Sequence, residues 1–333
     1  MPQRKCHRSL FVMKNDSINI FFSCDDGYAP FLAVAIDSLK QNRNQSRKYN
    51  IVVLHTGISQ KNINLISSFY GEKNFGVNFK NITPYVKHFS EKLHTRDYYS
   101  KTTYYRLFIP NLFPKLEKAL YLDSDIVING DISLLYDTEL GDKLVGATPD
   151  EFVNNYAPLR LYTQNRVGVT KEDGYFNAGV LLMNLDALRK FNFEKVFLSV
   201  LQQVKFDVAQ DQDYLNAICK NRVVYLPYDW NEMPLNKTVK STSAKLIHFN
   251  LDCKPWQKDG VLYSDIFWKF ARRSPYYANI KAVRRNFDIS RVLNAENQTK
   301  SLIRTAWSQA LDTVECNRVC SLIDRCVALP CAI

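Results

Sequence analysis

Short apolar segments alternate with longer amphipathic segments from the start of the chain to about residue 250. We expect the apolar segments at residues 18–23, 49–56, 76–82 and 118–122 to form strands. The amphipathic segments have apolar residues at three- and four-residue spacing, and we expect helices at residues 31–42, 60–71 and 102–109. This alternation predicts an α/β fold with a mostly parallel sheet and helices on both of its faces. Ligands of such sheets bind beyond the carboxyl ends of the strands.

The same pattern continues toward the C-terminus. Apolar strands are expected at residues 175–185, 222–227 and 244–250, and a helix is expected at residues 211–219. The chain has 333 residues, 46% of them hydrophobic, which suits one large domain or one domain with an appendage. A charged fraction of 23% is ordinary for a folded protein and argues against disorder.

The chain is basic, with 44 Lys and Arg residues against 33 Asp and Glu residues. A net charge of +11 favours polyanionic partners such as nucleic acid, anionic lipid or a phosphorylated substrate. The apolar stretch near the start, residues 10–13, is too short for a secretory signal, and no run suits a membrane span. We therefore expect a cytoplasmic protein whose eight cysteines are thiols, the four near the C-terminus being ordinary helix residues.

Two aspartates interrupt the apolar stretch "KALYLDSDIVIN", directly after an expected strand. A carboxylate beside a core is costly unless its charge is compensated. Asp123 and Asp125 therefore lie either in a polar turn or on a cation. Oxygen ligands of this kind suit Mg²⁺ or Mn²⁺, especially where substrate phosphates complete the coordination shell. The pair alone leaves both interpretations open, because aspartates are also common turn residues.

A histidine ends another apolar strand in "KLIHFNLDCKPW". A single histidine is usually a structural or exposed residue, but a lysine, a proline and a tryptophan follow His248 closely. A cation on a stiff loop beside an imidazole suits a diphosphate, with His248 on a metal and Lys254 on the phosphate.

Other polar residues also stand at the ends of expected strands or at the starts of helices. Asp25 and Asp26 follow the first strand, where they either cap the next helix or bind a nucleotide base or ribose. Asn177 and the run at residues 210–213 carry amide and carboxylate groups that suit sugar hydroxyls. The alternative for Asp211 or Asp213 is a helix cap. Arg106 lies within an expected amphipathic helix, where an arginine is normally solvated or ion-paired.

The chain changes character near residue 271. From there to the end it has ten basic residues against five acidic ones, and apolar residues from 302 to 314 fall at helical spacing. Two interpretations remain open. The segment is either a packed C-terminal helix or a basic surface helix that lies on an anionic membrane.

Seven motifs, taken in order, resemble glycosyltransferase family 8. They are "CDDGYA", "TTYYRL", "YLDSDIVINGDI", "VGATPD", "YFNAGVLLMNL", "QDQDYLN" and "HFNLDCKPW". The resemblance runs from about residue 18 to residue 256 and is strongest to the bacterial lipopolysaccharide and lipooligosaccharide galactosyl- and glucosyltransferases. It implies a GT-A fold, a UDP-galactose or UDP-glucose donor, Mn²⁺ or Mg²⁺, and retention of the anomeric configuration.

The resemblance also implies roles for individual residues. Asp123, Asp125 and His248 match metal ligands, and Asp150 lies where relatives meet the acceptor. Catalytic roles fall to Arg106, Asp211, Gln212 and Lys254, the last as the diphosphate lysine. The donor-binding set is Asp25, Asp26, Tyr28, Arg106, Asp123, Ser124, Asn177, Ala178, Asp211, Gln212, His248 and Lys254. The chain departs from the family at Leu251, where glycine is usual, and at Gly27, where a larger polar residue is common.

The sequence thus predicts a retaining UDP-sugar-dependent hexosyltransferase of cell-surface glycan synthesis. Its GT-A catalytic domain is expected at residues 16–270, and a basic helical extension with a peripheral membrane role at residues 271–333. Gln212 is a poor nucleophile, which favours attack from the leaving-group face over a covalent intermediate. A nucleotide-sugar hydrolase or nucleotidyltransferase, a non-catalytic nucleotide-sugar-binding relative and a self-glucosylating initiator remain alternatives. We expect a glycan or glycolipid acceptor and no nucleic acid partner.

Overall fold

The computed structural model describes residues 17–87, 93, 101–235, 237–311 and 314–328. Its central sheet has seven strands in the order β3-β2-β1-β4-β7-β6-β8, and β5 pairs with β9 in a separate small sheet. The strands are β1 (Ser17–Ser23), β2 (Lys48–His55), β3 (Phe75–Asn81), β4 (Lys118–Leu122), β5 (Ile126–Ile128), β6 (Val145–Ala147), β7 (Val180–Asn184), β8 (Val223–Tyr225) and β9 (Leu246–His248).

The sheet is mostly parallel, as the alternation predicted. β1 runs parallel to β2 and β4, β2 to β3, and β6 to β8, whereas β7 is antiparallel to both of its neighbours. The reversed direction of β7 was not predicted, because a buried strand has the same apolar pattern in either direction.

The strand expected at residues 175–185 is shorter in the structure and begins only at Val180. Side chains take the backbone hydrogen bonds of the preceding residues. The backbone N–H of Phe176 donates to Asn216, and that of Gly179 donates to Asn177. These bonds hold residues 175–179 in a loop, so that the expectation was wrong for this part.

Helices cover both faces of the sheet, and alternate residues of a strand enter different clusters. In β1, Ile20 and Phe22 pack with one cluster and Phe21 packs with the other. The helices before β7 are η1 (Asp26–Tyr28), α1 (Ala29–Asn42), α2 (Gln60–Tyr70), α3 (Thr83–Val86), η2 (Lys101–Phe108), α4 (Ile109–Leu112), α5 (Ile132–Tyr136), α6 (Glu151–Asn155), α7 (Ala157–Tyr162) and η3 (Thr163–Val167). The later ones are α8 (Leu185–Lys190), α9 (Phe193–Leu201), α10 (Asp211–Cys219), η4 (Tyr228–Trp230), α11 (Ser264–Ala271), α12 (Tyr277–Asn286), α13 (Ile289–Ala310) and α14 (Val314–Ala328).

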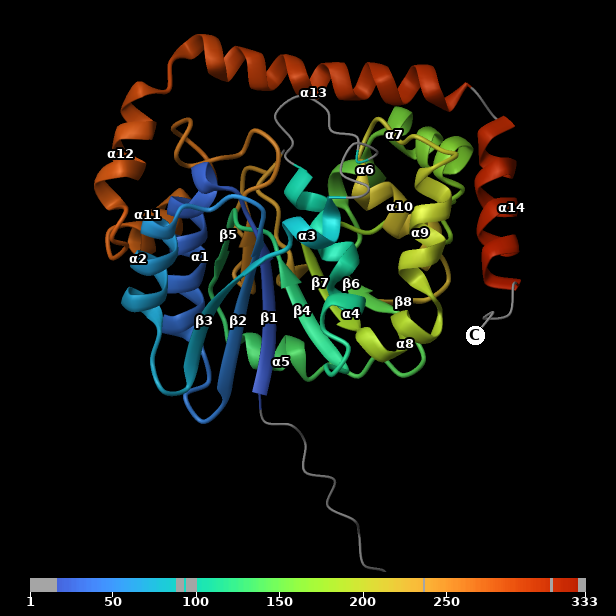
Figure 1. Ribbon diagram of the computed structural model, residues 1–333. Helices are drawn as coiled ribbons and strands as arrows, with labels where there is room; N and C mark the ends of the chain where they lie inside the picture. The colour runs from blue at the N-terminus through green and yellow to red at the C-terminus, as the bar shows by residue number, and fades with distance from the viewer. Residues whose placement is uncertain (1–16, 88–92, 94–100, 236, 312–313, 329–333) are drawn as a thin grey trace, which may run out of the picture.

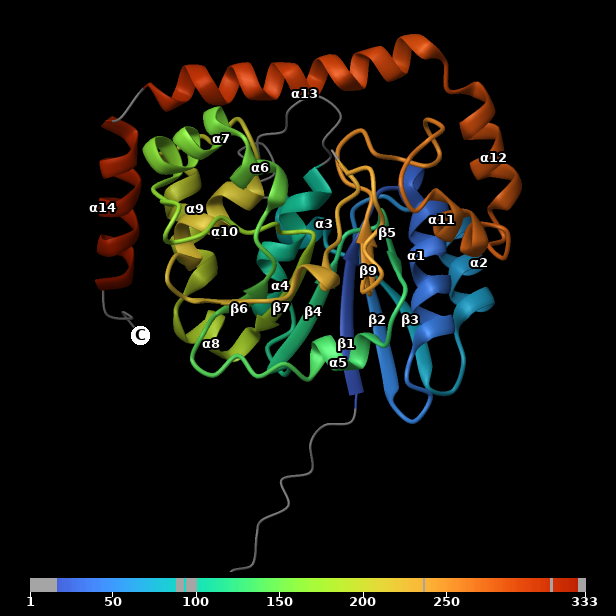
Figure 2. The ribbon, with the colours of Figure 1, turned by 180° about the vertical axis from the view of Figure 1, so that it is seen from behind.

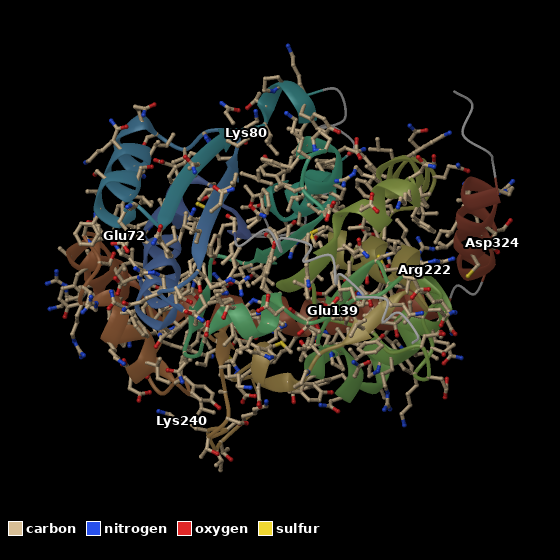
Figure 3. All side chains as sticks on the ribbon, turned by 90° about the horizontal axis from the view of Figure 1, so that it is seen from below. Glu72, Lys80, Glu139, Arg222, Lys240 and Asp324 are labelled. Carbon is tan, nitrogen blue, oxygen red and sulfur yellow. The ribbon has the colours of Figure 1, made fainter. Side chains whose placement is uncertain are left out.

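The last three helices form a strap around the body. α13 runs across the molecule above α6 and α7, with α12 beside α1 at one end and α14 beside α9 at the other (Figures 1 and 2). The view from below has α14, marked by Asp324, at the end opposite Glu72 (Figure 3). None of the described helices is long and apolar enough to cross a membrane.

The inner face of the strap is packed, as one of the two interpretations predicted. Leu302, Ala306 and Ala310 of α13 are buried, as are Val319 and Leu322 of α14. Apolar side chains on the outer side of the strap stay exposed, including Trp307 of α13 at 49% and Leu311, directly after α13, at 68%. The packed inner face agrees with the first interpretation, and the membrane contact stays a prediction.

Candidate functional site

Two aspartates and one histidine meet beyond the carboxyl end of β4. One ligand atom from each of Asp123, Asp125 and His248 lies within 4.8 Å of the others. The Nε2 atom of His248 is 3.3 Å from Oδ1 of Asp125 and 3.7 Å from Oδ2 of Asp123. The pairing of β5 with β9 brings these distant parts of the chain together, because Ile126 lies opposite His248.

The orientation of the His248 ring is fixed from behind. Its Nδ1 atom lies 3.0 Å from Oδ1 of Asn231, and the amide of Asn231 donates to Asn177 over 2.9 Å. Because the Asn231 oxygen can only accept, Nδ1 carries the proton and Nε2 keeps its lone pair toward the aspartates. Sequence reasoning missed Asn231, since its neighbours "DWNEM" resemble an ordinary loop.

Gly179 is a second residue that sequence reasoning missed. An added Cβ atom here would lie 2.3 Å from Cε1 of His248 and 2.8 Å from Oδ2 of Asp123. The backbone carbonyl of Gly179 also accepts from the backbone N–H of Asp123 over 2.8 Å. The loop can approach the three ligand residues only because this position has no side chain. The glycine in "YFNAGV" was the available signal.

Lys254 compensates the charge of Asp125. Its buried ammonium donates to Oδ2 of Asp125 and to the backbone carbonyl of Phe249. Burial alone would raise the pKa of Asp125, but the neighbouring ammonium of Lys254 holds that pKa well below its usual range. Asp125 is therefore ionised at neutral pH.

Arg106 joins two acidic residues from different elements. Its Nε atom lies 2.9 Å from Oδ2 of Asp211, and its guanidinium is 3.2 Å from Oδ1 of Asp123. Burial opposes the charge of Arg106, but Asp123 and Asp211 keep its pKa above the ordinary value. Burial raises the pKa of Asp211, and Arg106 opposes that shift. The interpretation of Arg106 as an ion-paired residue was correct, and its partners are both predicted site residues.

A network of amides surrounds Asp150. Oδ2 of Asp150 accepts from Asn177 over 2.9 Å and from Gln212 over 3.0 Å, and Oδ1 caps α6. The side-chain oxygen of Gln212 accepts from the backbone N–H of Ala178. Gln212 is thus held at both ends, between the β7 loop and Asp150.

The residues expected near a nucleotide divide into two groups. Asp25 and Tyr28 line the cavity described below, and Oδ1 of Asp25 caps the short helix η1 by accepting from the Tyr28 backbone. Ser124 also lines it and donates to the backbone of Ser23. Asp26 does not line it, because its carboxylate accepts from Ser59 and Asn62 at the start of α2.

One cavity of about 210 Å³ connects these groups. Apart from Asp26 and Ala178, every predicted donor-binding residue lines it. These are Asp25, Tyr28, Arg106, Asp123, Ser124, Asn177, Asp211, Gln212, His248 and Lys254, together with the metal candidate Asp125. Leu251 also lines the cavity and has a φ of 49°, a left-handed conformation that favours glycine. The departure from the family at Leu251 thus keeps a glycine-like backbone.

The ligand residues fit a divalent cation. Two carboxylates and an imidazole with its lone pair directed inward are a donor set that suits Mn²⁺ and related ions. Because Gly179 has no side chain, the space beside His248 and Asp123 stays open for the ligand atoms to converge.

A family model for glycosyl transferase family 8 matches residues 19–260. A Haemophilus influenzae protein with a glycosyltransferase name is 31% identical over 224 residues, covering 67% of this chain and 66% of that protein. The chain thus spans about two thirds of this relative. The lipopolysaccharide 1,2-glucosyltransferase of Escherichia coli strain K12 is 28% identical over 291 residues, covering 80% of each chain.

Among solved structures, the galactosyltransferase LgtC in complex with donor and acceptor sugar analogs superposes with a TM-score of 0.66. It is 28% identical in sequence, and the match covers 78% of this chain and 96% of LgtC. The expected GT-A fold is therefore confirmed.

Proposed function

Because the chain belongs to glycosyltransferase family 8, we propose that it transfers a hexose from a UDP-sugar to a cell-surface glycan. One observation carries this proposal. The carboxylates of Asp123 and Asp125, the imidazole of His248 and the ion pair of Arg106 with Asp211 line a single cavity. A cation site beside groups that suit sugar hydroxyls is the arrangement that a nucleotide-sugar donor requires.

We propose UDP-glucose or UDP-galactose as the donor and Mn²⁺ as the cation held by Asp123, Asp125 and His248. Mg²⁺ would be a weaker substitute, because an imidazole ligand favours a transition metal. When bound, the cation supplies positive charge to the diphosphate. The Escherichia coli relative is named a glucosyltransferase and LgtC a galactosyltransferase. These names support a hexose donor without choosing between glucose and galactose.

The leaving group is UDP, and the protein must accommodate its growing negative charge. Lys254 has the only charge among the residues after β9 that line the cavity in the described chain, and its ammonium already lies against Asp125. We propose that Lys254 turns from Asp125 to the diphosphate when the donor binds. Arg106 then holds Asp211 in place for the hydroxyls of the donor sugar.

The hydrogen bonds of Gln212 and Asp211 support attack from the leaving-group face. Gln212 is an amide whose oxygen accepts from the Ala178 backbone, and Asp211 is ion-paired with Arg106. Neither group is poised to form a bond to the anomeric carbon. We propose that the acceptor hydroxyl attacks as the bond to UDP breaks, and that the departing phosphate oxygen takes the hydroxyl proton.

A panel of nucleotide sugars tests the donor class. Purified protein with Mn²⁺ should release UDP from UDP-glucose or UDP-galactose, slowly by hydrolysis and faster when a glycan acceptor is added. Release that no acceptor accelerates would favour the hydrolase alternative. Nucleotide-sugar binding without any UDP release would favour the non-catalytic relative, and glucose bound covalently to the protein would identify a self-glucosylating initiator.

We also propose that the outer face of α13 rests on the cytoplasmic side of an anionic membrane. Leu293, Lys300, Arg304, Trp307 and Leu311 are all exposed and fall on one face at helical spacing. Apolar and basic residues on the same face suit a surface that is apolar inside and negatively charged outside. A glycolipid acceptor would be found there.

Vesicle binding tests this orientation. Each basic residue near an anionic surface contributes about 1 kcal/mol, and salt screens the attraction. Binding to phosphatidylglycerol vesicles should weaken as the salt concentration rises, and Trp307→Ser combined with Lys300→Glu should reduce it further without altering UDP release. Equal binding by this variant and the wild type would refute the membrane contact.

A further inference from the structure

The C-terminal strap contributes a wall to the reaction cavity. Leu302, on the inner face of α13, lines the same cavity as the catalytic residues and is 6% exposed. α13 lies wholly outside residues 19–260, the part of the chain that the family model matches. This wall therefore lies outside the part of the chain that the family model matches.

The wall is apolar, and part of it belongs to the helix that Asp150 caps. Leu302 shares the cavity with Phe152 and Val153 of α6 and with Val208, four residues before Gln212. All four apolar side chains also belong to one buried cluster. One side of the cavity thus offers polar atoms to a sugar, and the other offers an apolar surface.

α13 is fixed firmly enough to act as a wall. Ala306 and Ala310 are fully buried along the same face, one and two turns beyond Leu302. The side chain of Asn165 donates to the backbone carbonyl of Ala310 over 2.8 Å. Gln309 donates to Asp207 over 2.8 Å, which ties α13 to the loop that leads into Gln210 and α10.

We propose that Leu302 is a specificity residue for the acceptor, and that it selects pyranosides that turn a C–H face toward α13. A pyranose has polar hydroxyls around its ring and apolar C–H faces, so Asp150 and Gln212 suit the hydroxyls while Leu302 and Phe152 suit a face. This inference rests on the proposed function. It assigns the choice of acceptor to the strap and leaves the donor with the part of the fold that the family model matches.

A second leucine separates this role from simple packing. Leu322 of α14 is 5% exposed and lies in the same buried cluster, but it does not line the cavity. Leu302→Ala and Leu322→Ala should lower the melting temperature by similar amounts. The probes are octyl β-galactoside, octyl β-glucoside and lactose, and UDP release is followed with and without each probe.

Leu302→Ala should reduce acceptor-stimulated UDP release about tenfold in kcat/KM for the probe while leaving the slow hydrolysis rate within twofold. Leu302→Met should restore most of the loss, and Leu322→Ala should show none. Leu302→Val replaces the alanine variant if that variant does not fold. Equal stimulation of the Leu302 variants and the wild type would overturn the inference, as would a wild type that hydrolyses the donor but responds to no probe. A wild type without UDP release would instead count against the proposed function.

Discussion

The Nδ1 atom of His248 donates a hydrogen bond to the side-chain oxygen of Asn231, 3.0 Å away, and this bond orients the ring. The same asparagine donates to Asn177, and Asn177 donates in turn to Asp150. A chain of buried amides therefore links His248, a candidate metal ligand on β9, to Asp150 at the start of α6. Such partners of a metal-binding histidine typically determine both ring orientation and affinity.

Replacing Asn231 should weaken Mn²⁺ binding without removing a ligand. In Asn231→Ala the His248 ring loses the acceptor that keeps the proton on Nδ1, and the fraction with a lone pair toward the aspartates falls. We expect the Mn²⁺ dissociation constant to rise about 10–100-fold. NMR of the imidazole nitrogens should find a proton on Nδ1 in the wild type and a mixture of tautomers in the variant. Unchanged Mn²⁺ affinity would show that Asn231 does not orient the ring.

An added methyl group at Gly179 should directly disturb the candidate metal site formed by Asp123, Asp125 and His248. Gly179→Ala places a Cβ atom against His248 and Asp123, so one of these side chains must move. We expect a loss of about 1–3 kcal/mol in stability and a large fall in Mn²⁺ affinity. Gly57→Ala is the matched control, because its added Cβ would have no neighbour within 4 Å. The prediction fails if both alanine variants bind Mn²⁺ like the wild type.

Removal of the metal should stop UDP release reversibly. Excess EDTA should abolish the activity, and Mn²⁺ should restore it better than Ca²⁺, because His248 supplies a nitrogen ligand that calcium rarely uses. The fold should persist, since its stability rests on two large buried apolar clusters rather than on the ligand residues. Full activity in excess EDTA would contradict a catalytic cation.

Asp213 should make stability depend on pH. Burial raises the pKa of Asp213 to about 6, although the hydroxyls of Tyr162 and Tyr175 donate to it. Because the folded pKa lies above the unfolded one, the contribution is fully present below about pH 4 and is lost as the pH rises through 6. A shift of this size corresponds to about 3 kcal/mol.

Urea unfolding between pH 4 and pH 7.5 measures this contribution. The free energy of unfolding of the wild type, relative to Asp213→Asn, should increase as the pH falls from 7 to 4. The asparagine is neutral throughout and serves as the reference. A difference that does not change with pH would contradict the raised pKa of Asp213.

The sequence allowed most of the cavity to be predicted, because polar residues at the ends of apolar strands converge when those strands are parallel neighbours. Asp123 and Asp125 follow β4, and Asp25 follows β1, which pairs with β4. His248 was also predicted from the sequence, but its position beside Asp123 and Asp125 depends on the antiparallel pairing of β5 with β9. That pairing involves only three residues in each strand, too few for a periodicity signal.

The residues that were missed act through shape or through contacts between distant segments. Asn231 matters because it lies behind His248, and Gly179 matters because it has no side chain. Asp26 carries the residue type expected of a nucleotide contact, but it bonds to the start of α2 instead. Residue type shows what a side chain can bind, whereas only the fold determines what lies beside it.

Titration of Mn²⁺ against the protein, followed by electron paramagnetic resonance in the presence of UDP, tests the central claim most directly. The wild type should bind one Mn²⁺ per chain, with a signal altered by UDP. Asp125→Asn keeps the size of the side chain but removes a charged ligand, so it should lose tight binding and UDP release while remaining folded. One Mn²⁺ bound equally well by both proteins, with equal UDP release, would contradict the assignment of this site.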